Sequence, residues 1–304
     1  MYRVAVLMST YNGEKYIKEQ IDSILLQETV EVTLMVRDDG SSDRTIEIIK
    51  EYQKSNGNIK LDIGKNVGVG NSFMQLVYDA GDEYDYYAFA DQDDVWLHRK
   101  LINAINKIEN REKPALYTSN QILVNSELEK IGMRYSAKPD TSFRQTMCQN
   151  KVSGCTMVWN KTLQKLLINT ARRPTAKLLR MRIHDVWVAM VADVAGEIIY
   201  DNEGYILYRQ HDNNVVGVRK PSLIKQWIEK IKDPEQRNGR SIICKEIFNG
   251  YKDLNNPDIA FIEMCGNYQK NANLKRKLLQ DSSIISHTNE SRVGFVVKVM
   301  TNLF

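Results

Sequence analysis

The feature that most constrains the fold is a regular alternation of short apolar runs with segments of helical periodicity along the first hundred residues. Residues 3–8 form a nearly continuous apolar run, which is typical of a strand buried on both faces of a parallel sheet. Further strand-like runs occupy residues 32–36, 59–62 and 85–89, and apolar residues recur at helical spacing between them. Repeated strand–helix alternation predicts an α/β fold on a mostly parallel sheet.

Polar or glycine-rich turns follow the ends of these four strands. They occupy residues 9–14, 38–43, 64–71 and 91–94. In open α/β sheets the ligand crevice lies outside the carboxyl ends of the strands. Four such loops at one edge are hard to ascribe to turn chemistry alone, and they predict a ligand site there.

Three carboxylates stand within residues 91–94, at the end of the fourth strand. Side chains alternate along an extended backbone, so we expect Asp91 and Asp93 on one face and Gln92 on the other. Two carboxylates on one face repel unless a cation lies between them, and their hard oxygen atoms suit Mg²⁺ or Mn²⁺. The alternative is an acidic turn that caps a helix starting near Trp96, and this short motif alone does not separate the two interpretations.

The pattern is looser beyond residue 110. Strands are expected at 116–124, 152–159, 197–200 and 204–208, and helices at 97–110, 161–170 and 185–195. From residue 219 onward the chain is helical in pattern and basic. It carries 15 Lys and Arg against 9 Asp and Glu there, so this part has a net charge of +6 and the preceding part −2. We expect a boundary near Val218, with domains at 1–218 and 219–304.

Composition and cysteine usage indicate the class of protein and its compartment. The 304 residues are 42% hydrophobic and 26% charged, which is typical of a globular chain. Four cysteines without metal-type spacing indicate reduced thiols. No signal-peptide pattern precedes the first strand, and no apolar run approaches the ~20 residues that span a bilayer. We expect a cytoplasmic protein whose basic end contacts an anionic partner, either a membrane or nucleic acid on charge alone; a solvated helical face is the simpler alternative.

Five motifs occur in order with ordinary spacing, at residues 9–14, 38–41, 91–94, 184–185 and 208–211. Together they resemble the family 2 glycosyltransferases over residues 2–217. The resemblance implies a GT-A fold, inverting transfer from a nucleotide-sugar donor and the use of a divalent metal. The motif Asp-Gln-Asp-Asp-Val-Trp, followed later by His-Asp-x-Trp and Tyr-Arg-Gln-His-x-x-Asn, is similar to the motifs of bacterial rhamnosyltransferases of surface-polysaccharide assembly.

The resemblance also assigns roles to single residues. It places the nucleotide sugar against Ser9, Tyr11, Asn12, Asp39, Asn66, Asn71 and Asp91. It places the metal against Asp91, Asp93 and His211. The ring of Tyr11 can stack on a pyrimidine, and Asp39 matches the carboxylate that accepts a hydrogen bond from the base or ribose. The simpler interpretation of Asp39 is an Asx turn, and Asn66 and Asn71 serve equally well as turn and cap residues.

Asp185 matches the position of the general base. Inversion requires a base on the acceptor hydroxyl and stabilisation of the departing diphosphate on the opposite face. The structural alternative is a capping carboxylate on the helix at 185–195, and a helix N-terminus would also keep Asp185 ionised. His184 is expected to be a packing neighbour. Asp94 is as well suited to capping the next helix as to the site.

The sequence leaves several alternatives open. A nucleotidyltransferase would carry a basic phosphate loop after the first strand, whereas residues 9–13 contain no lysine. A glycoside hydrolase needs no nucleobase site, and a non-catalytic nucleotide-sugar sensor would retain the fold. The preferred donor is dTDP-β-L-rhamnose, with UDP-sugars as the alternative, and the acceptor is a glycan or a lipid-linked oligosaccharide. We expect peripheral contact with the inner face of the plasma membrane, no nucleic-acid partner, and leave a homo-oligomer open.

Overall fold

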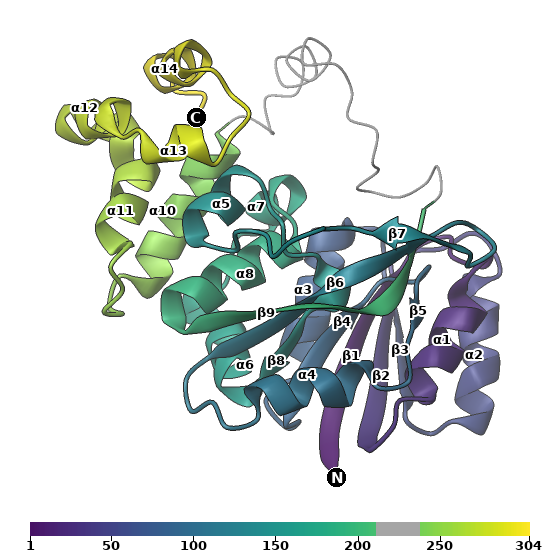
Figure 1. The fold of residues 1–304 in the computed structure, drawn as a ribbon. Coiled ribbons are helices and arrows are strands. Elements are labelled where there is room, and N and C mark those ends of the chain that lie inside the picture. Colours follow the sequence, from purple (N-terminus) through teal and green to yellow (C-terminus); the bar gives the residue numbers. More distant parts are fainter. Residues whose placement is uncertain (211–237) are drawn as a thin grey trace.

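A nine-stranded sheet forms the centre of the molecule in a computed structural model that describes residues 1–210 and 238–304. The strand order is β3-β2-β1-β4-β8-β6-β9-β5, with β7 paired to β6 (Figure 1). The strands are β1 (Tyr2–Thr10), β2 (Val30–Asp38), β3 (Ile59–Ile63), β4 (Tyr86–Ala90), β5 (Val95–Trp96), β6 (Ala115–Val124), β7 (Lys130–Met133), β8 (Val158–Asn160) and β9 (Glu197–Arg209).

Helices cover both faces of this sheet. In the first part of the chain they are α1 (Ile17–Leu25), α2 (Thr45–Ser55), α3 (Val69–Asp79), α4 (Lys100–Ile108), α5 (Phe143–Cys148), α6 (Lys161–Ile168), α7 (Ala176–Met181) and α8 (His184–Ala195). The C-terminal part contains α10 (Gly239–Tyr251), α11 (Ile259–Asn267), α12 (Ala272–Gln280), α13 (Ser283–Ser286) and α14 (Arg292–Met300). Three-residue 3₁₀ turns lie at Gly154–Thr156, Thr170–Arg172 and Tyr268–Lys270.

Parallel pairing dominates the sheet, as the sequence predicts. β1 pairs in parallel with both β2 and β4, and β6 pairs in parallel with β9. The antiparallel contacts are short, with only two or three residue pairs each. Alternation along β1 explains the two cores. Ala5 and Leu7 face the helices α3 and α8, whereas Val4 and Val6 face α1, α2 and α4.

Two expectations about the later strands are wrong. The stretch 152–159 is a strand only from residue 158, because a 3₁₀ turn forms where the amide of Met157 donates to the carbonyl of Gly154 at 2.9 Å. The two strands expected at 197–200 and 204–208 are one strand, β9, whose register with β6 shifts near Asn120. The irregular residues between the two apolar runs interrupt the strand pattern in the sequence, so the sequence predicts two strands where the structure has one.

The helical C-terminal region is confirmed by α10 to α14. These helices contribute Ile243, Ile262 and Phe295 to the same hydrophobic core that contains Phe143 of α5 and Trp187 of α8. Figure 1 places them beyond α5 and α7, at one side of the sheet. Within residues 1–210 and 238–304, no helix has the length and apolar character needed to cross a bilayer. The expected boundary near residue 218 lies outside the described residues.

Candidate active site

A cavity of about 670 Å³ lies at the carboxyl ends of β1, β2 and β4. The strand–helix alternation predicts a ligand site at this edge. Eight of the residues selected from the sequence line the cavity: Ser9, Tyr11, Asn12, Asp39, Asn66, Asp91, Asp93 and Asp185. Asn71 does not line it; its side-chain amide donates to the carbonyls of Val67 and Ala176 and so joins the start of α3 to α7. His211 lies outside the described residues.

The loop after β1 is held by Gln92 of the acidic turn. The amide of Tyr11 donates to Gln92 Oε1 at 2.9 Å, and Gln92 Nε2 donates to the Tyr11 carbonyl at 3.1 Å. Gly13 makes this approach possible, because a Cβ there would lie 2.4 Å from Gln92 Oε1. The Tyr11 ring remains 49% exposed at the cavity. An exposed aromatic ring on a fixed backbone is suited to stacking on a base.

Asp38 and Asp39 are buried at the end of β2 and have different tasks. Asp38 closes its own turn, since its carboxylate accepts from the amide and hydroxyl of Ser41. Asp39 reaches the next loop, where it accepts from the amides of Val67 and Gly68 at 2.9–3.1 Å, and it also pairs with Arg37. Asp39 therefore shapes the loop 64–68 beside the cavity.

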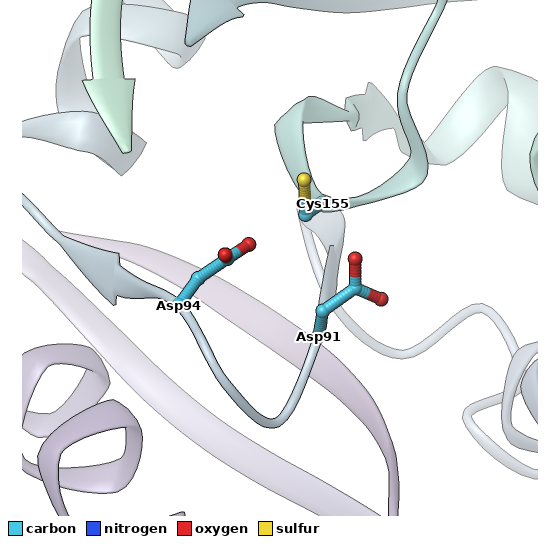
Figure 2. Close-up of side chains that lie close together, drawn as sticks. All are labelled: Asp91, Asp94 and Cys155. Carbon is cyan, nitrogen blue, oxygen red and sulfur yellow. The ribbon is translucent and has the colours of Figure 1, made fainter. Parts of the chain in front are cut away.

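The acidic turn brings Asp91, Asp94 and Cys155 together (Figure 2). One side-chain ligand atom from each lies within 4.8 Å of the others. Because β4 ends at Ala90, residues 91–94 form a turn and the strand alternation expected for Asp91 and Asp93 does not extend to them. The cap interpretation of Asp94 is wrong. β5 follows the turn directly, α4 starts only at residue 100, and Asp94 is buried beneath the turn.

The electrostatics of the turn suit a divalent cation. Burial, together with the charges of Asp93 and Asp185, raises the pKa of Asp91 to about 7. Burial also raises the pKa of Asp94, and Asp94 Oδ2 has no hydrogen-bond partner among the described residues. A cation would remove this repulsion, and carboxylate oxygens are the ligands that Mg²⁺ and Mn²⁺ prefer. Burial raises the pKa of the Cys155 thiol well above its usual value, so the thiol stays protonated beside them.

Arg209, at the end of β9, holds the acidic turn of residues 91–94 in place. Its Nε donates to the Asp93 carbonyl at 3.0 Å and its Nη1 to the Ser126 carbonyl at 2.7 Å. It also pairs with Glu19 of α1. Arg209 is 1% exposed, so its charge depends on buried partners such as these rather than on water. It is a positioning residue that the sequence analysis did not single out.

Asp185 lies in the first turn of α8, which begins at His184. It is therefore inside the helix rather than at the cap position. Its Oδ1 accepts from the Val186 amide at 2.6 Å, and its Oδ2 accepts from Asn150 Nδ2 at 3.0 Å. Burial raises the pKa of Asp185 to about 6. A carboxylate with this pKa is ionised at neutral pH and still basic enough to take a proton.

His184 is confirmed as a packing residue. Its ring stacks on Phe73 at 3.9 Å between centroids and meets the edge of Phe89 at 4.7 Å. Burial lowers its pKa to about 3, so the imidazole is neutral.

Sequence reasoning gave no binding role to several residues of the cavity wall, namely Lys15, Tyr16, Gln92, Arg134, Asn150, Lys151 and Tyr208. Arg134 follows β7, donates to Gln121 Oε1 at 2.8 Å and lies over the Tyr208 ring. Its charge also lowers the pKa of Asp185, which partly offsets the effect of burial. Three cations on this wall suit an anionic ligand such as a diphosphate. Arg134 and Asn150 lie in an irregular polar stretch without periodicity, so no signal marks them.

Asn150→Ala is expected to lower the transfer rate by up to about 10²-fold, because Asp185 loses the partner that fixes its orientation. The donor KM should change little, since the contact is with Asp185, the predicted base. Steady-state kinetics with varied donor and acceptor measure both. Asn150 Nδ2 also donates to the Val152 carbonyl at 2.8 Å. Asn58→Ala is the matched control, because Asn58 Nδ2 likewise donates to a valine carbonyl, that of Val32, and does not line the cavity. A loss of thermal stability in Asn150→Ala with unchanged kcat would contradict the positioning role.

Comparisons with known proteins agree with this geometry. The sequence profile described as "Glycosyl transferase family 2" matches residues 5–166. The dTDP-rhamnosyl transferase RfbG of Shigella flexneri is 34% identical over 219 residues, which make up 69% of this chain and 73% of that protein. The UDP-Glc:alpha-D-GlcNAc-diphosphoundecaprenol beta-1,3-glucosyltransferase WfgD of Escherichia coli is 25% identical and covers 74% of this chain and 84% of its own.

Among solved structures, residues 1–349 of S. aureus TarS in complex with UDP-GlcNAc have a TM-score of 0.60. The likeness covers 99% of this chain and 82% of that one at 17% identity, so it supports the fold alone. The GT-A architecture expected from the sequence is thereby confirmed. A cavity lined by Asp91, Asp93 and Asp185 in a GT-A fold is the arrangement expected of a glycosyltransferase. The chain belongs to glycosyl transferase family 2.

Proposed function

We propose that this protein transfers L-rhamnose from dTDP-β-L-rhamnose, with inversion, to a glycan or lipid-linked acceptor in bacterial surface-polysaccharide synthesis. The observation that carries the proposal is the single cavity that holds the acidic turn and Asp185 together. The 34% identity to a dTDP-rhamnosyl transferase supports the choice of donor. UDP-sugars are the second candidate, because WfgD is named for UDP-Glc.

An apolar part of the cavity wall is compatible with a 6-deoxy sugar. Val152, Ile183 and Val186 line the cavity next to Asp185. A methyl group at C6 gains from contact with such an apolar wall, at about 25 cal/mol per Å² removed from water.

In this mechanism the nucleobase stacks on Tyr11, beside the loop that Asp39 shapes. Asp91 and Asp93 would hold the divalent metal, which would supply positive charge to stabilise the departing diphosphate. Lys15, Arg134 and Lys151 add positive charge to the wall. Asp185, oriented by Asn150, takes the proton of the acceptor hydroxyl as that oxygen attacks the anomeric carbon from the opposite face.

A donor panel tests the proposal. We expect dTDP-L-rhamnose to raise the melting temperature most, because ligand binding stabilises the folded state by mass action. dTDP-glucose should bind more weakly, and UDP-glucose and UDP-GlcNAc more weakly still. Donor hydrolysis in the presence of Mn²⁺ provides the second readout. dTDP-glucose has the same base as dTDP-L-rhamnose but a different sugar, and UDP-glucose has the same sugar as dTDP-glucose but a different base. The panel therefore separates selectivity for the base from selectivity for the sugar. Turnover of a UDP-hexose without any turnover of dTDP-L-rhamnose would contradict the proposed donor.

A further inference from the structure

The C-terminal helix α14 is apolar on two opposite faces. Phe295 and Val299 are buried against the rest of the molecule. Val293, Val297 and Met300 are 73%, 44% and 58% exposed. Their spacing of four and three residues places them on one stripe, which faces away from the buried side. A helix that is apolar on both sides is ordinarily covered on both, so we expect the outer stripe of α14 to contact a binding partner.

Positive charge is concentrated around this stripe. Residues 270–304 contain six Lys and Arg against two Asp and Glu, a net charge of +4. The whole chain also has a net charge of +4, so residues 1–269 are neutral overall. Asp281 pairs with Arg144, and Glu290 pairs with Arg240 and with Lys298, which is one of the six. Arg276, Lys277 and Arg292 are exposed.

The basic helix α12 and the apolar helix α14 lie side by side. Arg292 at the start of α14 donates to the carbonyl of Leu279 at 3.0 Å, and Lys275 of α12 donates to the carbonyl of Met300 at 3.3 Å. The two helices are therefore antiparallel neighbours. In Figure 1 both lie at the end of the molecule toward which the carboxyl ends of the parallel strands point.

We propose that α12 and α14 form a surface that docks on an anionic lipid bilayer. The apolar stripe would enter the headgroup region while the basic residues face the lipid phosphates, as amphipathic interfacial helices do. A second copy of this chain is a poorer occupant, because its equivalent surface would bring another +4 charge against the first. The inference does not depend on which sugar donor is used.

The docking surface is connected to the active site through α5. Arg240 of α10 donates to the carbonyl of Cys148 at 3.3 Å, and Arg144 of α5 donates to Ser283 of α13 at 2.6 Å. Cys148 ends α5, and Asn150 follows two residues later in the cavity wall. A bilayer held by α12 and α14 would thus be coupled by packed elements to the segment that orients Asp185.

Vesicle flotation with the full chain tests the proposal. We expect the protein to float with vesicles of phosphatidylcholine and phosphatidylglycerol, but not with phosphatidylcholine alone, and to dissociate as salt rises. The triple variant Val293→Ser, Val297→Ser, Met300→Gln should lose binding. Arg276→Gln with Lys277→Gln should weaken it about 25-fold, since each cation near an anionic surface contributes about fivefold.

The matched control is Leu26→Ser with Ile63→Ser, which removes apolar side chains that are 59% and 47% exposed on the sheet domain. It should float like the wild type. Circular dichroism and the donor-induced melting shift should be unchanged in all variants, because the substituted residues are exposed and outside the cavity. Failure of the wild type to float, or unaltered flotation of the triple variant, would overturn the proposal. A dimer in analytical ultracentrifugation that the triple variant dissolves would assign the stripe to a second copy instead.

Discussion

Replacing Asp185 with asparagine is expected to lower the single-turnover transfer rate by about 10²–10⁴-fold while donor and metal binding persist. The proposed donor contacts come from the loops after β1, β2 and β4, whereas Asp185 comes from α8. The effect should therefore appear in kcat rather than in the donor KM. Burial raises the pKa of Asp185 to about 6, so the wild-type rate should rise with pH through that value as the base becomes ionised. The variant should lack this rise.

The same helix supplies a matched control. Asp193 of α8 also has a pKa raised to about 6 by burial, and its carboxylate accepts from the Phe143 amide at 3.1 Å outside the cavity. Asp193→Asn makes the same chemical change and should leave the transfer rate near that of the wild type. If Asp185→Asn transferred sugar normally and only melted at a lower temperature, Asp185 would be a structural residue of the helix start.

Asp93→Ala is expected to reduce transfer by about 10³-fold or more, and chelation of the wild type should do the same. Stabilisation of the leaving group by a metal contributes several kcal/mol, and about 1.4 kcal/mol corresponds to a factor of ten. Mn²⁺ binding followed by electron paramagnetic resonance gives a readout independent of activity. The fold should survive, because the alanine variant keeps the backbone carbonyl to which Arg209 Nε donates at 3.0 Å.

Asp79→Ala is the control for a general loss of negative charge. Asp79 is exposed on α3, where it accepts from Gln75. The Asp79→Ala variant should bind Mn²⁺ and transfer sugar like the wild type. Full activity of Asp93→Ala in metal-free buffer would falsify the metal role.

The sequence predicts the edge of the sheet better than it predicts the side-chain geometry at that edge. Alternating strands and helices require the loops after β1, β2 and β4 to meet, and the cavity lies there. The sequence does not predict the directions in which the Asp91 and Asp93 side chains point, because the alternation of side chains along the strand ends with β4 at Ala90. Asp94 turns inward toward Cys155, a residue 61 positions later whose proximity depends on how β8 enters the sheet.

Residues that orient the site were harder to find for a related reason. Asn150 and Arg134 come from a stretch with neither helical nor strand periodicity, and their roles arise only from the contacts they make with Asp185 and Gln121. Arg209 lies within a recognised motif, but its task depends on pairings with Glu19 and the Asp93 carbonyl. Local patterns carry no information about such distant partners.

The anchoring of the acidic turn by Arg209 also has a consequence for how the site is assembled. The contact between Arg209 and the Asp93 carbonyl spans 116 residues, and β5, which follows the turn, pairs with β9. The family profile ends at residue 166, before β9 begins. At about 5–20 residues per second, a ribosome makes the carboxylates roughly 6–23 s before it makes their anchor. The nascent chain thus holds every acidic residue of the turn well before it holds the turn in its working shape.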